Sequence, residues 1–90
     1  MKADQSIGEM KNLGPKMAAW LAEAQIYTRG DLERIGAVMA YKILQHHHPK
    51  VSILALYSMY AALEDRHWNS LSLEEKARLK AEADDTLDVG

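Results

Sequence analysis

The sequence predicts an all-α protein, a compact bundle of five or six short helices. Helix-start signals recur along the chain, each a hydroxyl residue followed three positions later by an acid. No stretch alternates for long with β-branched residues between turn signals, as a strand would. The most apolar run covers residues 51–63 and is interrupted only by Ser52 and Ser58. Because this run is shorter than the roughly 20 residues that span a bilayer, it predicts a buried central helix.

The helix starts are expected at three pairs that fit a capping box: Ser6 with Glu9, Thr28 with Asp31, and Ser72 with Glu75. Pro15 suits the first turn of a helix, where its missing N–H costs nothing, and Pro49 stops the helix before it. Together with Gly14 and Gly36 as turn residues, these signals predict helices over residues 7–12, 15–24, 31–35, 37–47, 50–66 and 73–83.

The chain of 90 residues is predicted to form one domain, with residues 1–5 and 84–90 frayed. It contains no cysteine, which excludes disulfides, thiol catalysis and cysteine-bound zinc. This composition and the lack of a signal peptide fit a cytoplasmic protein. The net charge of −2 argues against strong non-specific nucleic-acid binding, although residues 11–50 hold six basic and only three acidic residues.

One pattern occurs twice. The stretch "NLGPKMAAWL" places Leu13-Gly14 between two predicted helices, and "RIGAVMAYKIL" places Ile35-Gly36 in the same way. A glycine at such a point permits a positive φ angle and close backbone approach. The sequence therefore predicts two helix, tight turn, helix units.

These residues resemble the C-terminal domain of TfoX/Sxy proteins, bacterial regulators of natural competence. The resemblance rests on "NLGPK", on residues 26–28 with Asp31-Leu32, on Ile35-Gly36-Ala37 with Tyr41, and on His67-Trp68 with Leu71. It covers about residues 9–80 and implies an all-helical domain related to helix-hairpin-helix modules, with no known catalytic residues. The family usually carries a further N-terminal domain, so the chain is expected to be a free-standing copy.

The resemblance to helix-hairpin-helix modules suggests the hypothesis that the two turns bind phosphate. Backbone amides at a helix N-terminus can hold a phosphate, and the candidate contacts are Lys11, Gly14, Lys16, Arg34, Gly36 and Lys42. Against this, Asn12 and Arg34 stand where such binders commonly have glycine, and Pro15 removes one amide. A purely structural turn is the other interpretation, and the two turns can share a duplex only if Lys16 and Arg34 lie on one face.

Four further residues are candidates either for binding a partner or for a structural role: Trp20, Tyr41, His67 and Trp68. His67 is expected to cap the last carbonyls of the 50–66 helix, and Trp68 to close the core over it. The histidines at positions 46–48 point about 100° apart on a helix, so no metal site is expected; they are expected to be exposed at the helix end.

No catalytic constellation is expected. Glu64, Asp65, His67 and Ser70 offer an acid, a base and a nucleophile, but their spacing does not bring them together. The predicted function is that of a non-enzymatic regulatory module acting through protein–protein contacts, with no cofactor, membrane or small-molecule substrate. An apolar stripe left uncovered on the 50–66 helix would serve a protein partner or a homodimer. The alternative is weak DNA backbone binding without sequence preference.

Overall fold

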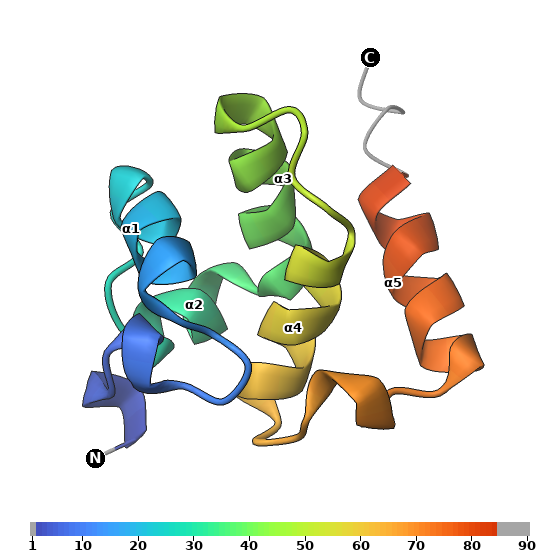
Figure 1. The fold of residues 1–90 in the computed structure, drawn as a ribbon, viewed down its shortest axis with the longest axis horizontal. Helices are drawn as coiled ribbons and strands as arrows, with labels where there is room; N and C mark the ends of the chain where they lie inside the picture. The colour runs from blue at the N-terminus through green and yellow to red at the C-terminus, as the bar shows by residue number, and fades with distance from the viewer. Residues whose placement is uncertain (1, 85–90) are drawn as a thin grey trace.

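The computed structural model describes residues 2–84 and is all-α over that range (Figure 1). Its helices are α1 (Pro15–Glu23), α2 (Arg29–Ile35), α3 (Ala37–His47), α4 (Leu54–Leu63) and α5 (Leu73–Asp84), with 3₁₀ turns η1 (Lys2–Asp4), η2 (Ile7–Glu9) and η3 (Trp68–Ser70). Within these residues the only extended pairing is an isolated bridge between Ser6 and Thr28. None of the helices there is long and apolar enough to cross a bilayer.

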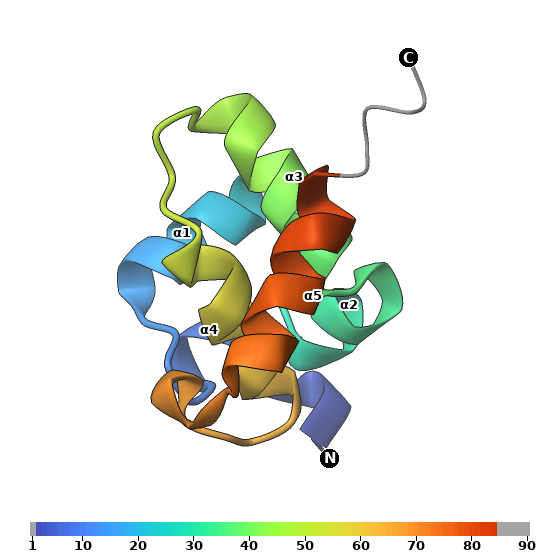
Figure 2. The same cartoon turned by 90° about the vertical axis from the view of Figure 1, so that its right-hand side faces the viewer.

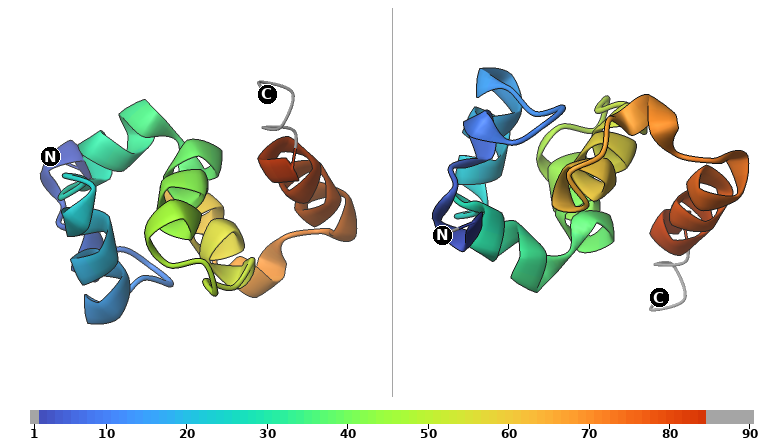
Figure 3. Two further views of the ribbon diagram at one scale, coloured as in Figure 1. Left: turned by 90° about the horizontal axis from the view of Figure 1, so that it is seen from above. Right: turned by 90° about the horizontal axis from the view of Figure 1, so that it is seen from below.

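The helices lie in three groups across the molecule. Helices α1 and α2 lie on one side, α3 and α4 form the middle, and α5 lies on the other side, in views from the front, above and below (Figures 1 and 3). The predicted central helix is confirmed, because α4 buries Ala55, Leu56, Met59, Ala61 and Ala62. It is shorter than the predicted 50–66 helix, since residues 50–52 form the connection from α3 and residue 65 has a positive φ of 57°.

Local hydrogen-bond chemistry sets two helix starts as predicted. Thr28 and Asp31 form a reciprocal capping box, in which the Asp31 amide donates to Thr28 Oγ1 and the Thr28 amide donates to Asp31 Oδ2, both at 3.2 Å. Ser72 and Glu75 do the same at 3.0 and 2.8 Å. Pro15 occupies the first turn of α1. The two turns following residues 13 and 35 therefore open helices at the expected places.

The predicted helix over residues 7–12 is wrong. Only the 3₁₀ turn η2 forms, and the Ser6 side chain makes no capping hydrogen bond. Ser6 instead has extended backbone paired with Thr28, and the flanking Ile7 amide donates to Tyr27 O at 3.3 Å. This pairing fixes the backbone before residue 7 and positions Ile7 in the core, where it is 1% exposed.

The described start of the chain, for which the sequence predicts fraying, contains a turn and an ion pair. Residues 2–4 form η1, and Lys2 Nζ lies 2.7 Å from Asp65 Oδ2. Of the expected frayed end over residues 84–90, Asp84 is the last residue of α5, and residues 85–90 lie outside the described residues.

Arg29 is a buried link between α2 and the end of α4 that the sequence did not single out. The residue is 4% exposed, and its guanidinium donates to Glu33 and Asp65 at 3.0 Å and to the Leu63 carbonyl at 2.6 Å. Hydrogen bonds lower the pKa of Asp65, with the largest contribution from Lys2 and the next from Arg29. Burying arginine requires such partners, so these contacts fix α2 against α4.

Candidate functional site

The first turn is held by Asn12. This residue has a positive φ of 73°, a conformation that asparagine tolerates better than most residues. Its side-chain amide donates to Arg66 O at 2.8 Å, and its Oδ1 accepts from the Trp68 amide at 3.1 Å. Arg66 lies in the connection between α4 and η3, and Trp68 is the first residue of η3. The stretch "NLGPK" therefore joins the N-terminal part of the chain to the far end of α4.

The same turn lacks one backbone amide that a phosphate could use. Gly14 has extended backbone with φ of −133° and caps α1 without a side-chain contact, and Pro15 has no N–H. The positive φ that glycine permits lies at Asn12 instead of Gly14. Lys11 and Lys16 are both exposed, and Lys16 Nζ lies 4.9 Å from the centre of the Trp20 ring.

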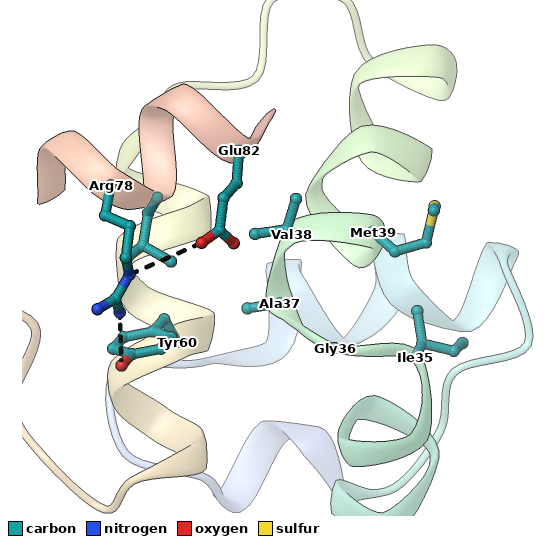
Figure 4. Close-up of a pocket in the computed structure, with 9 residues that line it drawn as sticks. Ile35, Gly36, Ala37, Val38, Met39, Tyr60, Arg78 and Glu82 are labelled. Atoms are coloured by element: carbon teal, nitrogen blue, oxygen red, sulfur yellow. Dashed lines mark hydrogen bonds and ion pairs between the residues drawn. The ribbon is translucent and has the colours of Figure 1, made fainter. Parts of the chain in front are cut away.

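The second turn differs in its chemistry. Gly36 has a positive φ of 87°, but Arg34 is paired within α2, where it donates to Asp31 Oδ1 at 2.5 Å. Gly36 borders a hollow of about 420 Å³ between the start of α3, α4 and α5 (Figure 4). The cation of that hollow is Arg78, which donates to the Tyr60 hydroxyl at 3.0 Å and lies 3.7 Å from Glu82.

The structure does not gather the six candidate phosphate contacts. The start of α1 and the junction between α2 and α3 lie at opposite edges of the molecule in the side view and in the views from above and below (Figures 2 and 3). Lys42 is half-buried on α3. Each turn thus has its own surroundings, and only the first has exposed lysines without an acidic partner among residues 2–84.

A groove runs beside the first turn, between α1 and the start of α4. Two adjoining hollows of about 530 and 510 Å³ share Lys16, Trp20, Lys50 and Val51. We call them together the Trp20 groove, lined by residues 14–17, Trp20, 47–52, 54–55 and 58. Figure 2 shows the connection from α3 to α4 on the same side of the molecule as the start of α1.

Trp20 and His48 form one wall of this groove. Their rings are stacked, with centroids 4.2 Å apart and planes 16° apart, and His48 Nε2 lies 3.0 Å from Glu23 Oε1. His48 is therefore half-buried, which corrects the expectation that all three histidines are exposed; His46 and His47 are exposed. No group of three potential metal ligands occurs in the described part of the chain.

The groove combines apolar surface with unpaired positive charge. Leu54, the first residue of α4, is 46% exposed although it belongs to the run predicted to be buried. Lys16 and Lys50 are exposed and line both hollows. Sequence reasoning did not single out Lys50 or Leu54. The available signal was the apolar surplus on every side of the 51–63 run, more than short neighbouring helices can cover.

The remaining candidate residues, Tyr41, His67 and Trp68, make contacts within the fold. Tyr41 is 4% exposed, its hydroxyl accepts from Gln45 at 3.2 Å, and burial raises its pKa. The prediction for His67 is wrong: its Nδ1 lies 2.9 Å from Asn69 Oδ1 and 3.5 Å from the Asn69 amide nitrogen, so its ring contacts the first turn of η3 and not the end of α4. Trp68 is half-buried against the core as expected, with Lys76 Nζ 5.7 Å from the centre of its ring.

The side chains considered for catalysis are all engaged elsewhere. Asp65 binds Lys2 and Arg29, and Glu64 pairs with Arg66 at 2.8 Å. The Ser70 hydroxyl donates to the His67 carbonyl at 2.7 Å, so the ring of His67 is not its base. Among residues 2–84 these groups therefore form no nucleophile–base pair of the kind that catalysis requires.

Comparison with known proteins agrees with this fold. The chain matches the model of the TfoX C-terminal domain over residues 3–83, and no curated protein matches it. Two crystal structures of Listeria monocytogenes proteins are similar. One, of an uncharacterized protein in a triclinic form, has a TM-score of 0.79 and 25% identity over 83% of this chain and 85% of that one. The other, of a protein of unknown function in a tetragonal form, has the same score and identity over 86% and 95%. The chain belongs to the TfoX C-terminal domain family.

Proposed function

We propose that the chain is a non-enzymatic, cytoplasmic interaction module that acts through protein–protein contacts, and that the Trp20 groove is its docking surface. One observation carries the proposal: an open apolar groove in which Leu54 is 46% exposed and a tryptophan forms one wall. Exposed apolar surface of this kind marks interaction sites, and tryptophan is enriched among residues that dominate binding energy. Membership of the TfoX C-terminal domain family, together with the sequence resemblance to regulators of competence, supports a regulatory role.

The test is site-specific photo-cross-linking in cells. A photoreactive amino acid at Ser52, an exposed position that lines the groove, should cross-link a partner that mass spectrometry identifies. That partner, purified, should then bind the unlabelled chain. The substitution Leu54→Arg should abolish the cross-link, because it places a charge in the apolar groove.

Leu73→Arg is the matched control. Leu73 also begins an α-helix, is 84% exposed, and does not line the groove. The control should keep the cross-link. A complete lack of protein cross-links at position 52, or equal loss in both variants, would contradict the proposal.

DNA backbone binding is the second candidate, favoured by the exposed lysines Lys16 and Lys50. Its test is fluorescence anisotropy with a short DNA duplex at low and at physiological salt, using Lys16→Glu beside the wild type. Because only two lysines meet there, binding should be weak, with a slope of log K against log salt near about −2. Binding of that kind, lost in Lys16→Glu, would favour DNA over a protein partner.

A further inference from the structure

We propose that the Trp20 groove selects one class of partner, an amphipathic α-helix of another protein that carries Asp or Glu beside its apolar stripe. This inference rests on the proposed function and specifies the chemistry of the partner. It is argued from the shape of the groove, its apolar surface and its charge.

The shape fits a helix. The two hollows of about 530 and 510 Å³ adjoin through four shared residues, so together they form one continuous trough that is open to solvent. Small ligands favour sites that enclose most of their surface, which an open trough does not do. A helix lying in a groove needs only one face covered and inserts side chains at successive turns.

The surface of the trough supplies apolar anchors. Met17, Trp20 and Val51 are partly buried against the core, and Leu54 is half-exposed at the rim. Helix α1 positions Met17 and Trp20 one turn apart, since residues three apart lie on one helix face. An apolar stripe on a partner would remove these side chains from water and gain the corresponding hydrophobic free energy.

The charge of the trough distinguishes among amphipathic helices. Lys16 and Lys50 line both hollows, and neither forms an ion pair within residues 2–84. No acidic residue lines the two hollows, and the nearby Glu23 lies at the edge, beside His48. The trough is therefore locally positive on a chain whose net charge is −2. Such rim charges favour partners of opposite charge and repel those of like charge.

A peptide helix fits these observations better than a nucleic acid. Phosphate binding at physiological salt depends on many cooperating cations, whereas two unpaired lysines line this trough. A duplex also has no apolar stripe to cover Leu54 and Val51.

The test is a selection from a displayed library of helical peptides, each about 18 residues long so that the helix can form. Every member carries the same leucine stripe, and the positions beside the stripe vary among Asp, Glu, Lys, Arg, Ser and Gln. Selection uses the full chain as target, with counter-selection on Leu54→Arg. We expect the enriched peptides to be acidic at the variable positions.

Charge-reversal variants then test the lysines with one enriched peptide labelled with fluorescein. Lys16→Glu and Lys50→Glu should each weaken binding by about two- to fivefold, the range of an exposed ion pair. Both should bind a version of the peptide with its acids changed to lysine more tightly than the wild type does. Lys80→Glu on α5 is the control, since Lys80 does not line the trough, and it should leave the affinity unchanged.

The outcomes separate this inference from the function on which it rests. Peptides that need Leu54 but are neutral or basic would overturn the acidic selectivity and leave a protein-docking groove in place. An absence of Leu54-dependent peptides would count against both. Displacement of an enriched peptide by duplex DNA, with loss of DNA binding in Lys16→Glu, would overturn the inference in favour of a nucleic-acid surface.

Discussion

Asn12 performs two separate tasks, one through its backbone and one through its side chain. Its φ of 73° reverses the chain before α1, and its amide group binds Arg66 O and the Trp68 amide. Glycine would preserve only the first task and alanine neither. The sequence suggested the first task, since asparagine tolerates this conformation. The second depends on partners more than fifty positions away, which local sequence does not indicate.

We predict that Asn12→Gly lowers the free energy of unfolding by about 1–3 kcal/mol, the cost of leaving half-buried polar groups unpaired. Asn12→Ala should cost a further 1–2 kcal/mol or so, because a Cβ disfavours the left-handed conformation. Urea unfolding measured by circular dichroism checks both. Equal stability of the two variants would mean that the turn has no left-handed residue at position 12.

At the scale of elements, the two similar turns are not equivalent. Gly36 has φ of 87° and ψ of 152° before α3, a region that glycine alone occupies readily. Gly14 before α1 has φ of −133°, which any residue adopts. The repeat in the sequence, an apolar residue followed by glycine, therefore corresponds to two different backbone geometries.

Gly36→Ala should lower the free energy of unfolding by about 1–3 kcal/mol, although a Cβ there would meet no atom within 4 Å. Gly14→Ala has equally open space and should change stability by less than about 0.5 kcal/mol. Thermal unfolding of both variants beside the wild type measures the difference. Equal effects of the two substitutions would contradict the distinction between the turns.

The start of α5 is tied to the end of α4 by a charged clamp. Arg66 lies 2.8 Å from Glu75 Oε2, and its guanidinium, followed by the Ser72 amide, lowers the Glu75 pKa from 4.5 to about 2. Because the folded-state pKa is lowered, Glu75 contributes stability that is complete above about pH 4.5 and is lost as the pH falls towards 2.

Glu75→Gln should therefore destabilise the protein at pH 7 and reduce the loss of stability between about pH 4.5 and 2. Glu74→Gln provides the control, since Glu74 is exposed and forms no ion pair among residues 2–84. Urea unfolding at a series of pH values tests this. An unchanged acid dependence in Glu75→Gln would show that the clamp does not form in solution.

At the scale of the whole molecule, stability should be unevenly distributed. Helix α4 buries five residues in the middle of the fold, whereas α5 buries only Leu79 and Ala83. Regions with few buried contacts open at lower free energy than the core. Hydrogen exchange should therefore show faster exchange in α5 than in α4, and α5 amides protected as strongly as those of α4 would contradict this.

The sequence predicted the fold class, because helix starts depend on contacts within a few residues. The capping boxes of Thr28 with Asp31 and of Ser72 with Glu75 are examples. The helix start predicted at Ser6 was wrong, because Ser6 pairs with Thr28 and forms no local cap. The sequence indicated the groove only through the surplus of apolar residues in the run over residues 51–63. Which side of that run stays uncovered depends on how α1 and the 48–52 connection lie, as the exposure of Leu54 shows.

The contacts of Lys2, Asn12 and Arg29 also have a consequence for synthesis on the ribosome. Each binds residues between positions 63 and 68, so the first third of the chain is translated long before its partners exist. We expect the nascent N-terminal helices to lack these stabilising contacts until the segment around Trp68 has left the exit tunnel. The domain then completes its structure in one late step, and not helix by helix as it emerges.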